Sequence, residues 1–319
     1  MLNDFVTFAS PSHLERNIEK RSDAGFLENV IHQKESRLLL FWKGMPLVDK
    51  QSNPVFLESS KKLVESIGNR VFLGTCEGIE YFAGDITREN TPLTINVIEN
   101  RLFDTNKYQH PDFPKYDFQN LRMLLPILKE SLLAELLATG KALLGWHFTH
   151  KYCSFCGSSS NLASAGWSRV CPACKAEHFP RCDPVVIMLI LRQNRLLLGR
   201  SYHWPQRMHS LLAGFMEPGE SIEAAVKREV YEEAEIIVDN ISYVSSQPWP
   251  FPTSLMIGCK GEAKTEDIKP LKKEIENALW LEREEVMEIY GGTRNDISLP
   301  RKGSIAEFLI RKWLEGNLI

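Results

Sequence analysis

Hydrophobic positions in the first half of the chain follow two spacings, and each spacing predicts a different element. Apolar runs at 37–42, 71–74 and 81–84 have the length of strands and are separated by Gly, Asn and Pro. From 118 to 146, leucines recur at the spacing of one helix face. Residues 1–118 are therefore expected to form a mixed α/β domain, followed by a helical connector at 119–150.

The second half opens with strand patterns and continues through a loop into a helix. The apolar run at 185–191 predicts a buried strand, and the run at 195–198, after a short turn, predicts its hairpin partner. Two glycines and a proline within 214–219 mark a loop, and apolar residues then recur at helical spacing over 222–230. A loop and helix are thus expected to follow a strand platform.

Three carboxylates project from one face of that helix. Glu229, Glu232 and Glu233 stand at i, i+3 and i+4. The like charges of Glu229 and Glu233 cost an isolated helix ~0.2 to 0.5 kcal/mol, so a cation is expected to offset their repulsion. Oxygen ligands alone favour a hard divalent ion such as Mg²⁺ or Mn²⁺. The alternative is an acidic helix face that is simply solvated.

Two pairs of cysteines predict a metal site of another kind. The spacing is Cys153-x2-Cys156, fourteen residues, then Cys171-x2-Cys174. Each pair can place two thiolates about one metal, and Zn²⁺ prefers four sulfur or nitrogen ligands in a tetrahedron. Four thiolates leave no position for water or substrate, so one structural Zn²⁺ per chain is expected in a zinc ribbon at 151–180. A single arginine lies between the pairs, which argues against nucleic-acid binding by the ribbon.

Composition and charge narrow the class of protein. The chain of 319 residues has a net charge of -3 and a pI of about 6.3, so it is not expected to hold long nucleic acid by backbone charge alone. It contains no apolar run of transmembrane length, and its N-terminus lacks a secretory apolar core. An intracellular, most simply cytoplasmic, protein without membrane contact is expected, with a peroxisomal location open despite no clear signal. Seven cysteines in a reducing compartment favour metal ligation over disulfides.

The loop and helix have the spacing of a known family signature. They resemble the Nudix box of hydrolases that split a nucleoside diphosphate linked to another group, at Gly214, Glu220, Arg228, Glu229, Glu232 and Glu233. The later stretch SQPWPFPTS, residues 246–254, resembles the motif that follows this box in NudC-type NADH pyrophosphatases. The cysteine pairs, the box and this motif also occur in that family's order. By composition alone, the proline-rich stretch could instead be an extended docking surface.

The resemblance covers about 118–310 and implies a fold and an activity. The implied architecture is α+β: an α-β-α Nudix fold in a catalytic domain at 181–319, after the N-terminal mixed α/β domain and the small zinc ribbon. The implied reaction is metal-dependent hydrolysis of the pyrophosphate of NADH to AMP and nicotinamide mononucleotide. NAD⁺ and the 5′ end of NAD-capped RNA are further implied substrates.

The same resemblance implies roles for particular side chains. Two or three Mg²⁺ or Mn²⁺ would be held by the catalytic glutamates of the box and by one later glutamate: Glu229, Glu232, Glu233 and Glu274. The substrate pocket would be lined by Phe215, stacked on the nicotinamide ring, and by Gln247, Ser254 and Ala306. Arg228 and Glu220 would brace the box, and the family's chains pair as homodimers.

One position departs from the family pattern. Glu235 stands where the box has Gly, which ends a helix in a left-handed conformation without a Cβ penalty. A non-Gly residue there costs ~1 to 2 kcal/mol. We expect Glu235 to keep the cap conformation, at some loss of stability and with the three glutamates upstream in place. The alternative is a helix that runs on through 235. Two other functions stay open: a catalytically weakened dinucleotide sensor, and a zinc-ribbon protein that binds RNA lacking an NAD end.

Overall fold

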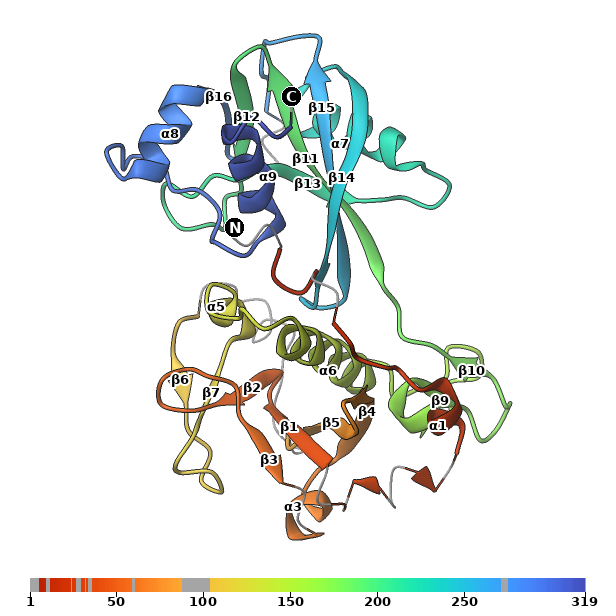
Figure 1. Cartoon of the computed structure of the whole chain (residues 1–319). Helices are drawn as coiled ribbons and strands as arrows, with labels where there is room; N and C mark the ends of the chain where they lie inside the picture. The colour runs from red at the N-terminus through yellow and green to blue at the C-terminus, as the bar shows by residue number, and fades with distance from the viewer. Residues whose placement is uncertain are drawn as a thin grey trace. The chain divides into compact units, whose positions relative to one another are not determined.

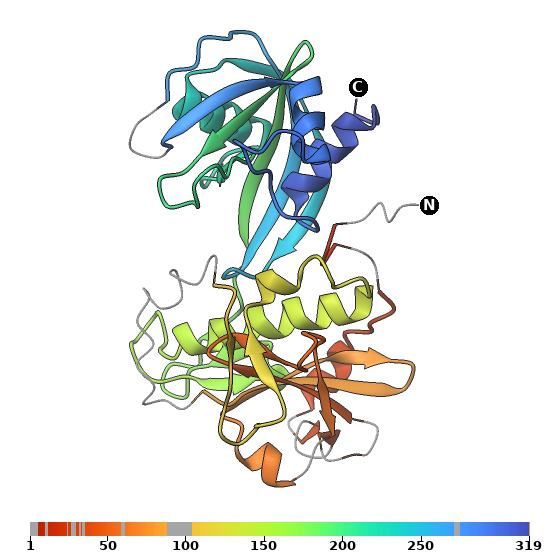
Figure 2. The same cartoon turned by 90° about the vertical axis from the view of Figure 1, so that its left-hand side faces the viewer.

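The computed structural model describes residues 6–9, 12–23, 25–26, 30–31, 33, 36–58, 61–87, 104–270 and 275–318. The chain divides into two compact units (Figure 1, Figure 2). The N-terminal unit comprises Pro11–Arg181 and Pro250–Thr253, and the C-terminal unit comprises Met1–Ser10, Cys182–Trp249 and Ser254–Ile319. Within the described ranges, no helix is both long enough and apolar enough to cross a bilayer.

A seven-stranded sheet forms the centre of the N-terminal unit. The elements in and around it are α1 (Ile18–Ser22), β1 (Ser36–Trp42), β2 (Met45–Val48), β3 (Phe56–Glu58), α3 (Lys61–Glu65), β4 (Asn69–Cys76), β5 (Ile79–Asp85), β6 (Lys107–Tyr108), β7 (Asp117–Gln119), α5 (Leu121–Leu124) and α6 (Ser131–Thr149). The strand order is β4-β5-β1-β2-β7-β6, and β3 also pairs with β1.

Helix α6 packs directly on this sheet. A Cβ added at Gly140 would lie 2.9 Å from Cβ of Ala83 on β5, and 3.1 Å from Cε2 of Phe41 on β1. Glycine therefore allows the close approach, because a larger residue would collide with both strands. The segment expected as a connector thus contains a helix that covers the N-terminal sheet.

A small three-stranded sheet follows α6, with β8 (Asn161–Ala163), the 3₁₀ helix η1 (Ser164–Gly166), β9 (Ser168–Val170) and β10 (Glu177–His178). A buried polar network joins it to α6. His147 Nε2 donates to the carbonyl of Gly166 (2.8 Å), and Arg169 Nη1 donates to His147 Nδ1 (3.2 Å). Burial lowers the pKa of His147 to about 4. The ring is therefore neutral at physiological pH, as its acceptor role toward Arg169 requires.

A six-stranded sheet forms the centre of the C-terminal unit. The elements are β11 (Asp183–Arg192), β12 (Arg195–Arg200), β13 (Leu212–Phe215), α7 (Ile222–Ala234), β14 (Val238–Trp249), β15 (Ser254–Ala263), β16 (Asn277–Glu282), α8 (Arg283–Gly291) and α9 (Ile305–Leu314). The strand order is β14-β15-β11-β12-β16, with β13 on β11, and β11 runs parallel to β15.

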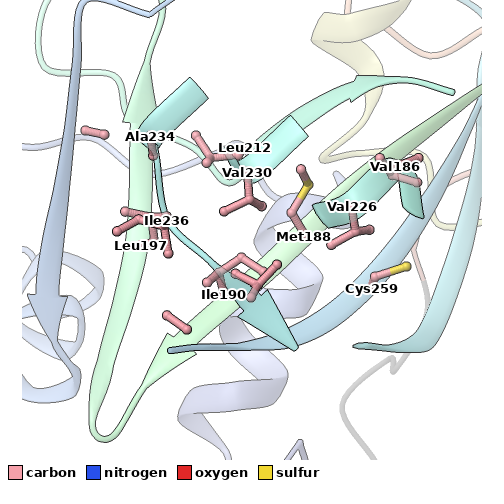
Figure 3. Close-up of a cluster of buried hydrophobic side chains, with 14 of the residues drawn as sticks. Val186, Met188, Ile190, Leu197, Leu212, Val226, Val230, Ala234, Ile236 and Cys259 are labelled. Atoms are coloured by element: carbon pink, nitrogen blue, oxygen red, sulfur yellow. The ribbon is translucent and has the colours of Figure 1, made fainter. Parts of the chain in front are cut away.

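Strand β11 is buried on both faces, so its apolar run divides between two cores. Val186, Met188 and Ile190 belong to the core that also contains the apolar side chains of α7 (Figure 3). Ile187 and Leu189 belong to the core that contains those of α9. This period of two places one helix on each face of the sheet. The α-β-α arrangement predicted for the C-terminal domain is therefore confirmed.

The two units share one topology. In both, a strand forms a hairpin with the next strand, pairs antiparallel with the third and lies parallel to the fifth: β1 with β2, β3 and β5, and β11 with β12, β13 and β15. The five-residue helix α3 (KKLVE) stands in the order where α7 stands in the second unit. Because α3 lacks the acidic cluster of α7, only the C-terminal copy carries the candidate catalytic carboxylates.

Candidate active site

Helix α7 begins at a side-chain cap and lies with its apolar face on the sheet. Ser221 accepts a hydrogen bond from the backbone N–H of Ala224 (3.2 Å), which satisfies one free donor of the first turn. Ala225, Val226 and Val230 are fully buried against β11 and its neighbours. This packing fixes the rotation of the helix and hence the direction of its glutamates.

The carboxylate of Glu229 lies against the backbone of β13 at Gly214. Its residue is 8% exposed, and a Cβ added at Gly214 would lie 1.9 Å from Glu229 Cδ. No side chain other than hydrogen can stand at 214 while Glu229 keeps this place. The first glycine of the box therefore makes room for a buried carboxylate.

Arg228 connects the loop to the acidic face of the helix. Its Nε and Nη2 donate to the two carboxylate oxygens of Glu220 (2.6 and 2.9 Å), a bidentate pair. Its Nη1 donates to Glu229 Oε1 (2.8 Å) and Glu232 Oε2 (2.9 Å), and its Nη2 also donates to the carbonyl of Phe215 (2.9 Å). The hydrogen bonds from Arg228 and from the backbone N–H of Glu217 lower the pKa of Glu220 to about 2. The expected brace between Arg228 and Glu220 is thus present.

The three candidate metal-binding glutamates of α7 differ in exposure. Glu229 is buried, Glu233 is half-buried and Glu232 is exposed. Among the described residues, only the four cysteines bring three or more metal-ligating atoms within 4.8 Å of one another. Arg228 instead stands between Glu229 and Glu232. Carboxylate oxygens are the ligands that a hard divalent ion prefers. One of these carboxylates, that of Glu229, is held in place against Gly214. Glu274 lies outside the described residues.

Helix α7 ends at the position that departs from the box. Glu235 has φ 54° and ψ 24°, the left-handed cap conformation that glycine favours. Its N–H donates to the carbonyl of Tyr231 (2.8 Å), and the N–H of Lys269 donates to the carbonyl of Ala234 (3.0 Å). Lys269 Nζ also pairs with Glu235 Oε2 at 3.3 Å. The predicted cap is confirmed, and the glutamates upstream remain within the helix.

The residues expected to line the substrate pocket lie in two environments. Phe215, at the end of β13, is 60% exposed beside Arg228, so its ring is accessible for stacking. Ser254 and Ala306 are buried. Gln247 is 0% exposed, and its amide forms hydrogen bonds to the backbone of other segments. The substrate roles of these four residues remain predictions.

The four predicted zinc ligands come together in the ribbon. Sγ of Cys153 lies 3.6 Å from Sγ of Cys174, and Sγ of Cys156 lies 3.5 Å from Sγ of Cys171. Four tetrahedral Zn–S bonds of ~2.3 Å separate their sulfurs by about 3.8 Å, so the cluster fits Zn²⁺. Nε2 of His178 lies 3.2 Å from Sγ of Cys153. The pattern of cysteines alone did not predict this contact, although His178 follows the last cysteine, Cys174, after only three intervening residues.

Three family models match successive parts of the chain. They describe a NADH pyrophosphatase-like rudimentary NUDIX domain at residues 35–146, a NADH pyrophosphatase zinc ribbon domain at 149–179 and a NUDIX domain at 181–301. The chain is 33% identical to a Macaca fascicularis protein named NAD-capped RNA hydrolase NUDT12, over 97% of this chain and 74% of that protein. The chain belongs to the NudC-type NADH pyrophosphatase family.

Other NudC-type relatives match shorter stretches. A Mycobacterium bovis protein named NAD-capped RNA hydrolase NudC is 39% identical over 64% of this chain and 67% of that protein. A Homo sapiens protein named NAD-capped RNA hydrolase NUDT12 is 40% identical over 58% of this chain, which spans only 42% of that protein's length.

Family membership also explains the N-terminal half, to which the sequence analysis assigned no role. The match at 35–146 describes this region as a rudimentary form of the NUDIX domain. The shared strand topology of the two units and the short α3 agree with that description. Local patterns did not reveal the repeat, because the two copies correspond in strand pairing while the box itself occurs once.

Proposed function

We propose that this NudC-type chain hydrolyses the pyrophosphate bond of NADH and releases AMP and reduced nicotinamide mononucleotide. The proposal is carried by the carboxylate of Glu229, which is held against Gly214 and linked through Arg228 to Glu232 on one helix. The three relatives reported above, each named NAD-capped RNA hydrolase, support the same class of reaction.

The acidic face of α7 would hold two or three Mg²⁺ or Mn²⁺, with Glu274 as a further ligand. When bound, such ions supply a water of lowered pKa and neutralise charge on the phosphate oxygens. Glu229, Glu232 and Glu233 would bind and orient them, and Glu229 or Glu233 would lie nearest the attacking water. Arg228 and Glu220 would keep these carboxylates aimed from the loop side.

Substrate would be recognised through the exposed ring of Phe215, which can stack on the nicotinamide. Ser254 and Ala306 would line the nucleotide pocket, and Gln247 would belong to the same region. The same cleavage at an RNA 5′ end would remove an NAD cap. NAD⁺ is a further substrate of this class, and the active form would be a homodimer.

The main alternative is a catalytically weakened dinucleotide sensor, which the presence of Glu235 in place of the box glycine suggested. That residue adopts the cap conformation and leaves the three glutamates within α7, so the substitution gives no reason for lost catalysis. Family resemblance and site geometry both favour the enzyme.

The decisive experiment is turnover of NADH by the purified chain with Mn²⁺, with products separated by chromatography. AMP and reduced nicotinamide mononucleotide in equal amounts, abolished by a chelator, are expected. Binding of NADH without any product would contradict the proposal and favour the sensor. A competition among NADH, NAD⁺ and NAD-capped RNA would rank the substrates, and gel filtration at assay concentration would test the homodimer.

A further inference from the structure

Residues 6–9 form part of the C-terminal unit. Val6, Thr7 and Phe8 are buried, and Val6 lies in the hydrophobic core under α9 with Ile305 and Phe308. We call residues 6–9 the N-terminal strap. Phe8 has φ 72°, a conformation that a bulky residue keeps only where its surroundings fix it. The strap is therefore held in place by the catalytic unit.

One buried amide ties the strap to the first turn of α9. Gln247 Nε2 donates to the carbonyl of Thr7 (2.6 Å) and to the carbonyl of Gly303 (2.9 Å). Gln247 Oε1 accepts from the N–H of Ile305 (2.8 Å), one of the N–H groups at the helix start that have no partner within the helix. The N–H of Thr7 donates to Gly303 as well (3.2 Å). Strand β14, the strap and α9 are thus joined at a single side chain.

This arrangement gives Gln247 an indirect route to the substrate. Both N–H groups of its amide have backbone acceptors, its oxygen has a backbone donor, and the residue is 0% exposed. The next residue after Ile305 is Ala306, which is expected to line the nucleotide pocket. Loss of the strap would take the Thr7 carbonyl away from one Gln247 N–H, so the amide would have to turn toward another acceptor and would displace the turn at Gly303.

We infer that the N-terminal strap and Gln247 form one positioning element, which sets the start of α9 and thereby the nucleotide pocket. Gln247 acts on substrate affinity through this turn and not by touching the substrate. The inference rests on the proposed function, because the pocket is the one proposed for NADH.

The test is a double-mutant cycle in the full chain. Val6→Asp places a charge in the core and ejects the strap, and Gln247→Met keeps the volume but removes the amide. Each single variant is expected to raise KM for NADH about tenfold with kcat within about threefold, since binding and not chemistry is affected. Because both changes disrupt the same positioning element, KM for NADH in the double variant should rise about tenfold in total and not about a hundredfold. Ile18→Asp and Gln193→Met, at exposed positions, are the matched controls and should leave KM unchanged.

Hydrogen exchange supplies a readout that does not depend on turnover. The Ile305 N–H should exchange faster in Val6→Asp and in Gln247→Met, while the buried strands keep their protection. Multiplicative effects on KM would overturn the inference, because Gln247 would then act independently of the strap. Unchanged KM in either single variant, or unchanged exchange at Ile305, would overturn it too. If the wild-type chain does not hydrolyse NADH, the proposed function is wrong. The exchange rate of the Ile305 N–H would still decide whether the strap positions α9.

Discussion

The Cβ position of Gly214 falls on the carboxylate of Glu229: an added Cβ would lie 1.9 Å from Cδ and 2.0 Å from Oε2. These two residues of the box lie 15 positions apart in the sequence. Gly214 constrains Glu229 because the carboxylate occupies the volume that a larger side chain at 214 would need. The glycine has no left-handed φ to explain it, so the need for glycine here is purely steric.

Gly214→Ala is therefore expected to move Glu229 and lower kcat for NADH by at least ~10²-fold, because a small misplacement of a catalytic group is costly. The unfolding free energy should change much less, because the atoms that an added Cβ meets are the end of a flexible side chain that can move aside. Steady-state kinetics and denaturant titration measure the two effects. Gly291→Ala in the same unit, where an added Cβ meets nothing within 4 Å, is the control. Near-normal turnover in Gly214→Ala would contradict the role given to Glu229.

Glu233→Gln tests the acidic face directly. It removes one negative charge and keeps the shape, so turnover of NADH should fall by at least ~10²-fold with little change in melting temperature. Glu223→Gln, at an exposed position of the same helix, should leave turnover within about threefold of wild type. If Glu233→Gln retains wild-type activity, the proposed catalytic role of this helix is wrong.

Local spacing was sufficient for the parts of the site that are close in sequence. The zinc site followed from the spacing of the four cysteines, because each pair lies within one turn. The brace between Glu220 and Arg228 and the cap at Glu235 followed from the resemblance to the Nudix box. Contacts that depend on folding across the sheet could not be read in this way. The hydrogen bond from Gln247 to Thr7 spans 240 positions. The repeat of the N-terminal half likewise resides in strand pairing and not in residue spacing.

The zinc site yields a prediction that is independent of catalysis. Elemental analysis should find one Zn²⁺ per chain, and its removal should lower the melting temperature, because the metal's binding energy contributes to folding. His178→Phe should weaken zinc binding by about 10- to 100-fold, as loss of a partner of a metal ligand commonly does. Cys182→Ser, an exposed cysteine outside the cluster, serves as the control. Protein purified without chelator that contains no zinc would contradict this assignment.

The buried ring of His147 predicts an acid-sensitive junction between α6 and the ribbon. Burial, with the like charge of Arg169, lowers its pKa in the folded chain from 6.5 to about 4. Between pH 6.5 and 4 the unfolded chain binds a proton at His147 that the folded chain does not. The stability of the folded chain that depends on a neutral His147 is therefore fully present above pH 6.5 and is lost as pH falls toward 4. From pH 6.5 to 5 the loss should reach up to about 2 kcal/mol. His147→Gln should remove that part of the pH dependence, measured by denaturant unfolding, whereas His203→Gln at an exposed position should keep it.

Glu235→Gly tests whether the departure from the box affects stability or catalysis. Glycine should relieve the Cβ strain of the left-handed cap and the unfavourable contact of a carboxylate with the helix C-terminus, together ~1 to 2 kcal/mol. Loss of the exposed ion pair with Lys269 subtracts less than about 1 kcal/mol, so the net change should raise the unfolding midpoint. Lys269→Met in the wild-type background isolates that pair.

Because the three glutamates lie upstream within α7, the rate for NADH should change by less than about tenfold, or ~1.4 kcal/mol in the barrier. Unfolding curves and kcat/KM measured on the same preparations decide the matter. A lowered midpoint would show that Glu235 stabilises the chain through contacts that outweigh its backbone strain. A rise of about a hundredfold in activity, ~2.7 kcal/mol in the barrier, would show instead that the natural residue restrains catalysis. The observed cap geometry favours a raised unfolding midpoint with little change in rate, since glycine can adopt φ 54° in place of Glu235 without moving the helix.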